Sequence, residues 1–122
     1  MSSSVVIYHN PRCSKSRQTL ALLREHGIEP TVIRYLDTPP DITTLEDLVA
    51  KLGIEAHGLV RRKEARYREL QLSPDLPAAK VIAAMAENPQ LIERPIVVAG
   101  NRAAIGRPPE NVLGILPNTP NN

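Results

Sequence analysis

The chain contains a single cysteine among its 122 residues, so no disulfide can form within it. The same count excludes metal sites built from several thiolates. Cys13 is therefore either an incidental thiol or the one reactive group of a catalyst that forms disulfides with other molecules. The sequence has no apolar run near the ~20 residues of a membrane helix and no signal peptide at its N-terminus. A cytoplasmic location is expected.

Aromatic residues are also scarce, with three Tyr and neither Trp nor Phe. The core must be aliphatic, and the aromatic platforms that stack single-stranded nucleic acid cannot be built. The formal net charge of +2 is too small to indicate a nucleic-acid-binding surface. We expect a monomer without nucleic-acid or membrane partners.

Acidic residues are missing from two stretches that carry several cations. None occurs before Glu25, and none lies between Glu93 and Glu110. The cations of these stretches are Arg12, Lys15, Arg17, Arg24, Arg94, Arg102 and Arg107. A third basic cluster spans 61–68. If the fold brings these segments together they form an anion site, and otherwise they are solvated surface charges.

The first forty residues predict a strand, a helix and a second strand. Val5–Tyr8 is a β-branched run typical of a buried strand. Helical spacing follows over Ser14–His26, with Gly27 as terminator. Thr31–Leu36 predicts the second strand, so this part is a βαβ unit with a parallel strand pair.

The middle of the chain is predicted to be a helical insert at about 41–90. Thr43 or Thr44 can cap a helix that ends at Gly53. A further helical stretch is expected over Glu55–Leu70, and another helix from Pro77 to about Asn88.

The last third predicts a β-hairpin and a helix. Strands are expected over Pro95–Ala99 and Ala103–Ile105, joined at Gly100 and Asn101, with a helix starting at Pro108. Residues 118–122 are expected to be a frayed tail. The order βαβ, helical insert, ββα predicts an α/β, thioredoxin-like fold with an inserted helical lobe, as one domain over 1–117.

Cys13 falls between a strand and a helix, where free backbone N–H groups and the helix dipole favour an anion. Arg12, Lys15 and Arg17 add positive charge around it. Buried apolar cysteines rarely have such neighbours, so we interpret Cys13 as a reactive thiolate.

Ser16 occupies the second position of what would otherwise be a Cys-x-x-Cys pair. It can form a hydrogen bond with the thiolate but cannot close a disulfide. An outside thiol must therefore resolve any adduct of Cys13, which in the cytosol means glutathione or a glutaredoxin. His9, just upstream, is either a base or a turn residue.

Three segments resemble the glutaredoxin-coupled arsenate reductase family: Ile7–Arg17, Glu93–Val98 and Ile105–Glu110. They occur in the family's order and at family-like separations, and the resemblance extends from about Val5 to Leu116. It implies a thioredoxin-like fold with a helical insert. The chain lacks the C-terminal extension of the longer family members and resembles a shorter branch.

The resemblance also implies roles for individual residues. Cys13 corresponds to the nucleophile, and His9 and Ser16 to the residues that assist its thiolate. The oxyanion-binding arginines correspond to Arg61, Arg94 and Arg107, with Arg62 as the alternative to Arg61, and Pro95 to a cis-proline. No bound cofactor or metal is implied.

The resemblance implies reduction of arsenate to arsenite, with glutathione as co-substrate and glutaredoxin as partner. Guanidinium groups suit this chemistry, because they bind oxyanions in bidentate fashion and relieve the repulsion between a thiolate and an anion. One alternative is a general glutathione-linked thiol oxidoreductase. A less favoured one is a non-enzymatic redox regulator that binds RNA polymerase, which typically needs a Cys-x-x-Cys pair.

Overall fold

The computed structural model describes residues 5–116. Its contacts divide the chain into two compact units. The first combines the two ends of the chain, up to Arg34 and from Arg94 onward, and the second comprises Tyr35–Glu93. The predicted insert at about 41–90 falls within the second unit.

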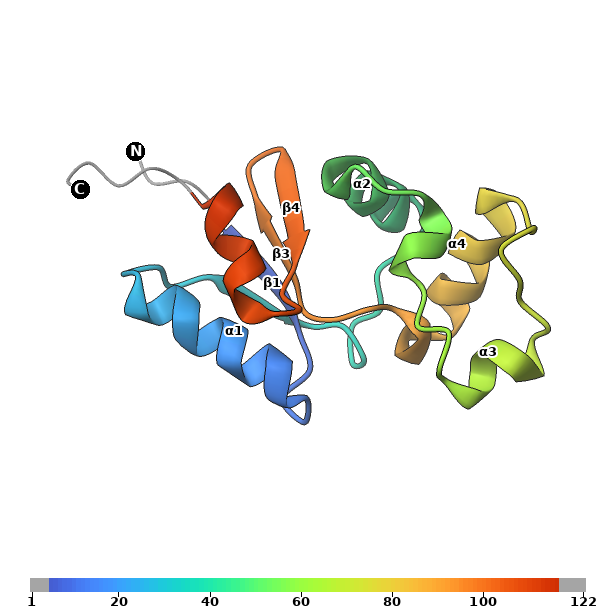
Figure 1. Cartoon of the computed structure of the whole chain (residues 1–122), viewed down its shortest axis with the longest axis horizontal. Coiled ribbons are helices and arrows are strands. Elements are labelled where there is room, and N and C mark those ends of the chain that lie inside the picture. The colour runs from blue at the N-terminus through green and yellow to red at the C-terminus, as the bar shows by residue number, and fades with distance from the viewer. Residues whose placement is uncertain (1–4, 117–122) are drawn as a thin grey trace. The chain divides into compact units, whose positions relative to one another are not determined.

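A four-stranded mixed sheet forms the centre of the first unit, in the order β2-β1-β3-β4 (Figure 1). β1 (Val5–His9) pairs in parallel with β2 (Thr31–Arg34) and antiparallel with β3 (Ile96–Ala99). β4 (Arg102–Ile105) completes the hairpin with β3. This parallel pair followed by an antiparallel hairpin is the thioredoxin-like arrangement that the sequence predicted.

Two helices pack together beside the sheet, α1 (Ser14–Glu25) and the 3₁₀ helix η3 (Pro109–Ile115), drawn in blue and red in Figure 1. β1 buries alternate residues, since successive side chains of a strand point to opposite faces. One buried core cluster of the unit contains Val5, Ile7, Leu23, Val97, Ala99 and Val112. His9 continues the inward set of β1 and is also buried, which places a titratable side chain at the end of this core.

The second unit consists mainly of helices. They are α2 (Ile42–Leu52), η1 (Ala56–Leu59), α3 (Ala65–Glu69), α4 (Ala78–Glu87) and η2 (Pro89–Leu91). α2 and α4 contact each other, and Leu45, Leu48, Val81, Ile82 and Met85 are buried on them. An isolated antiparallel bridge joins Val60 to Ile92 and ties the segment after η1 to the end of the unit.

Four details differ from the sequence prediction. Asp41 caps α2, accepting a hydrogen bond from the Thr44 N–H at 2.8 Å, so neither Thr43 nor Thr44 is the cap. Only two short helices form within Glu55–Leu70, because the backbone after Leu59 pairs with the 91–93 segment. β2 ends at Arg34 rather than Leu36. The helix predicted after Pro108 is 3₁₀. The predicted tail at 118–122 lies outside the described residues.

Candidate active site

A short turn delivers Cys13 from the end of β1 to the start of α1. The Cys13 N–H donates to the Asn10 carbonyl at 3.0 Å, and the Arg12 N–H donates to Asn10 Oδ1 at the same distance. Cys13 itself has extended backbone angles, φ −94° and ψ 124°, and is the N-cap residue of the helix. The predicted position of the thiol at the mouth of a helix is therefore confirmed.

No side chain caps this helix end, and no acidic residue lies in its first turn. The first helical hydrogen bond runs from the Arg17 N–H to the Cys13 carbonyl at 3.0 Å. The N–H groups of Ser14, Lys15 and Ser16 precede it, so they have no carbonyl partner within the helix. With the positive end of the helix dipole, these groups make the surroundings of Cys13 suited to an anion.

His9 and Ser16 form a buried pair behind the turn. His9 Nδ1 lies 2.6 Å from Ser16 Oγ, which also accepts the Asn10 N–H at 3.0 Å. Burial, and then the positive charges of Arg34, Arg24 and Arg17, lower the pKa of His9. His9 is therefore neutral at pH 7, and the pair links the end of β1 to the first turn of α1.

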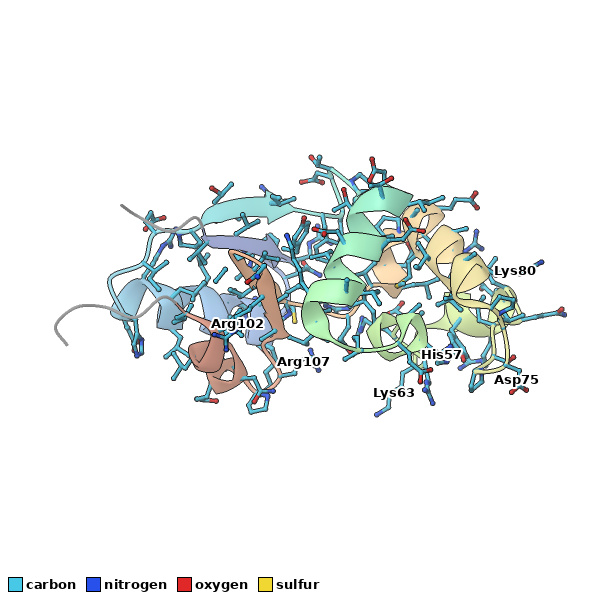
Figure 2. All side chains as sticks on the ribbon, turned by 90° about the horizontal axis from the view of Figure 1, so that it is seen from above. His57, Lys63, Asp75, Lys80, Arg102 and Arg107 are labelled. Atoms are coloured by element: carbon cyan, nitrogen blue, oxygen red, sulfur yellow. The ribbon has the colours of Figure 1, made fainter. Side chains whose placement is uncertain are left out.

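Arg94 and Arg107 meet at the open end of the β3–β4 hairpin. The Arg107 guanidinium donates to the Arg94 carbonyl at 3.3 Å, and the Gly106 N–H donates to the Pro95 carbonyl at 2.9 Å. Arg94 is half-buried, whereas Arg107 is exposed (Figure 2). The Arg94–Pro95 peptide bond is cis, as the resemblance implied. The Arg107–Pro108 peptide bond is also cis, and the sequence did not predict it.

Gly106 is where the hairpin approaches α1. A Cβ atom on this glycine would lie 2.5 Å from Thr19 Oγ1 and 2.9 Å from Pro95 Cγ. Thr19 is fully buried, and its hydroxyl donates to the Lys15 carbonyl at 2.8 Å. The helix that begins at Cys13 thus packs directly against the loop that carries Arg107. Sequence reasoning missed Asn10, Thr19 and Gly106, although the glycine directly before Arg107 was a usable signal.

Arg61 belongs to the second unit, unlike the other candidate site residues. Its guanidinium pairs with Glu64 at 2.7 Å and with Glu93 at 3.5 Å, and its side chain is 20% exposed. Its N–H donates to the Leu91 carbonyl at 2.7 Å, which fixes the backbone. Arg62, the alternative, is exposed.

Within residues 5–116, no three His, Cys, Asp or Glu side chains are grouped so that they could hold a metal ion. The helices of the same range are too short or too polar to cross a membrane.

The sheet topology and the single thiol at a helix start define a one-cysteine, thioredoxin-like protein. The chain belongs to the ArsC family, whose model matches residues 8–115.

Named relatives agree with this assignment. The chain is 56% identical to the uncharacterized protein YfgD of Escherichia coli K12, over 95% of this chain and 99% of that protein. It is 50% identical to an arsenate reductase of Neisseria meningitidis serogroup A, over 92% and 97% of the two chains. A solved arsenate reductase from Vibrio cholerae is 54% identical, with a TM-score of 0.92 over 95% of this chain and 100% of that one.

Proposed function

We propose that this protein reduces arsenate to arsenite, with Cys13 as nucleophile, glutathione as co-substrate and glutaredoxin as the partner that regenerates the thiol. The observation that carries the proposal is the thiol at an uncapped helix start, in the same unit as the joined Arg94 and Arg107. The similarity to arsenate reductases of Neisseria meningitidis and Vibrio cholerae supports the substrate. Glutathione as reductant favours the cytoplasm, where thiols are kept reduced.

Arsenate near neutral pH is an anion, and its approach to a thiolate needs positive charge. The N–H groups at the start of α1 supply part of it, and the guanidinium groups of Arg94 and Arg107 supply the rest from the hairpin. Arg61 is proposed as the third guanidinium on the family resemblance; in this structure it pairs with Glu64 and Glu93, and its alternative Arg62 is exposed.

The reaction balances with two thiols. The Cys13 thiolate attacks arsenic, an S–As(V) bond forms, and one oxygen leaves as hydroxide, which becomes water on protonation. The glutathione thiol then attacks the adduct, and its sulfur ends in a disulfide with Cys13 while arsenic takes up two electrons and leaves as arsenite. The glutaredoxin thiolate attacks the glutathione sulfur of this mixed disulfide, forms a new disulfide with it and releases the Cys13 thiolate. The cationic groups stabilise the charge that develops as hydroxide leaves.

His9 and Ser16 are proposed to hold the thiolate rather than to exchange protons with the substrate. A neutral His9 can donate its Nδ1–H to Ser16 Oγ, which already accepts the Asn10 N–H. With both of its lone pairs engaged, the Ser16 hydroxyl proton is available to the Cys13 thiolate. This assigns the proton to Nδ1 of His9.

The test is a coupled assay with glutathione, glutaredoxin, glutathione reductase and NADPH, in which NADPH is oxidised only when arsenate is added. Cys13→Ser should abolish turnover, because a hydroxyl cannot replace the thiolate. Arg107→Ala should lower kcat/KM about 10²–10³-fold, the effect of losing one preorganised oxyanion donor. Arg102→Ala is the matched control: this arginine is the first residue of β4, at the turn of the hairpin, and donates to the Gly114 carbonyl at 2.7 Å.

The alternatives give different results in the same assay. Reduction of glutathionylated protein through Cys13, without arsenate turnover, would identify a general thiol oxidoreductase. Inactivity toward both substrates, together with co-purification of RNA polymerase, would identify the regulator.

A further inference from the structure

An open groove lies beside the turn that carries the thiol. Its volume is about 660 Å³, within the usual range of small-ligand sites. His9 and Pro11 form one end, Leu20 and Ala21 contribute an apolar lining, and Arg17 and Arg24 are its cations. All of these residues belong to β1, α1 and the turn between them, so the groove and Cys13 are in one unit (Figure 1).

Positive charge is concentrated at the Cys13 end of this groove. Arg17 lies over the turn, because its guanidinium donates to the Pro11 carbonyl at 2.9 Å. Arg34 on β2 is the register partner of His9 in the parallel pair. The same cations, with Arg24, depress the pKa of His9 after burial, which indicates that their field reaches this end.

Two acidic residues lie at or just after the C-terminal end of α1, and one of them, Glu25, lines the groove. Glu25 is the last residue of α1, and Glu29 pairs with Arg24 at 3.0 Å. Glu29 accepts two hydrogen bonds from the Arg24 guanidinium, whereas the Arg17 guanidinium keeps N–H donors beyond the one that Pro11 accepts. The guanidinium donors that no carboxylate occupies therefore belong to Arg17, next to the turn that carries the thiol.

We propose that the positive end of this groove, between His9, Pro11 and Arg17, binds the carboxylate of the small thiol that attacks the Cys13 adduct. The proposal rests on the proposed function, and it names the class of thiol that the site selects: peptide thiols with a carboxylate, such as glutathione, over neutral thiols.

The dimensions fit such a ligand. A helix rises about 1.5 Å per residue, so Arg17 lies about 6 Å along the axis from Cys13, and Arg24 about 16 Å. A carboxylate one or two residues from a thiol extends about 4–7 Å from it. A peptide thiol whose sulfur reaches Cys13 can therefore place its carboxylate at Arg17, whereas the backbone of Arg24 lies about 10 Å farther along the axis.

The test uses disulfide exchange, which needs no arsenate. The Cys13 thiolate attacks oxidised glutathione, forms a mixed disulfide and releases one glutathione thiolate, and the neutral 2-hydroxyethyl disulfide reacts by the same step. The ratio of the two rates, followed by mass spectrometry, cancels any change in the reactivity of the thiol itself. We expect Arg17→Gln to lower this ratio about 5–10-fold, because a charge-assisted hydrogen bond at an exposed site is lost.

The matched control is Arg12→Gln, which removes an exposed cation one residue from Cys13 but outside the groove. It should leave the ratio within about twofold, as should Arg24→Gln. Equal losses in the Arg12 and Arg17 variants would mean a general field rather than a binding site, and would overturn the proposal. So would a wild-type protein that does not prefer oxidised glutathione. If arsenate is not turned over but the ratio responds to Arg17 alone, the proposed function fails and the groove assignment stands.

Discussion

Replacing Gly106 with alanine should strain the contact between α1 and the hairpin. The new methyl group would lie 2.5 Å from Thr19 Oγ1 and 2.9 Å from Pro95 Cγ, closer than packed atoms allow. Neither neighbour can move easily. Thr19 is fully buried and its hydroxyl is hydrogen-bonded to the Lys15 carbonyl. Pro95 is also buried, and its side chain is closed into a ring. Overpacking of this kind costs about 1–3 kcal/mol.

A second substitution, Thr19→Ala, tests whether that contact is the cause. Alone it removes a hydrogen bond worth about 0.5–1.5 kcal/mol and a buried methyl worth about 0.8 kcal/mol. In the Gly106→Ala background it also removes the two Thr19 atoms that clash with the new methyl group. The double variant should therefore be about 1–2 kcal/mol more stable than the sum of the single losses predicts.

Urea unfolding followed by circular dichroism measures these free energies of unfolding. Thermal unfolding gives a second readout, with a shift of about 3–6 °C per kcal/mol for a chain of this size. Gly114→Ala is the control, because its Cβ would meet no atom within 4 Å. Additive losses in the double variant, or a Gly106→Ala variant as stable as the control, would refute the reasoning.

Three further predictions concern the two histidines with lowered pKa values, the Ser16 hydroxyl, and Arg61 with its neighbour Arg62. The pKa values of His9 and His57 (Figure 2) are both lowered, chiefly by burial, so the unfolded chain binds these protons first. The stability that these two side chains contribute is complete above the ordinary histidine pKa of 6.5 and is lost as the pH falls below it. The urea concentration at half-unfolding should therefore decrease below pH 6.5. It should decrease less in the His9→Asn, His57→Asn double variant. Ser16→Ala should slow alkylation of the thiol by iodoacetamide about tenfold near neutral pH, because a hydrogen bond to the charged sulfur is lost; an unchanged rate would exclude that bond. Arg61→Ala should lower kcat/KM for arsenate about 10²–10³-fold while Arg62→Ala stays within about twofold, and the reverse order in the coupled assay would assign the oxyanion to Arg62.

The arrangement around the thiol could be predicted from local sequence. The β-branched run before the turn and the helical spacing after it placed Cys13 at the start of α1. The paired strands of the hairpin, with Gly100 at positive φ, followed from the same kind of pattern. These features depend on neighbours within a few residues, and such neighbours are readable from periodicity and turn chemistry.

Helix propensity was a poorer guide in the insert. The charged stretch of Glu55–Leu70 contains good helix formers, yet only η1 and α3 form there. The N–H of Arg61 donates to Leu91 and that of Glu93 donates to Leu59, so pairing across thirty residues replaces local helical bonds. Tertiary contacts override propensity because each residue's preference is worth only a fraction of a kcal/mol.

The sequence by itself determined the fold class and the place of the single thiol, because one cysteine lies between a strand and a helix whose limits are local. Only the tertiary structure decided which distant segments pack together around the start of α1. The Arg107 guanidinium reaches the Arg94 carbonyl, and Gly106 leaves room for Thr19, through contacts between segments far apart in the chain. Such contacts depend on how closely particular side chains pack in the folded protein. The order of residues along the chain does not show which distant side chains will pack together.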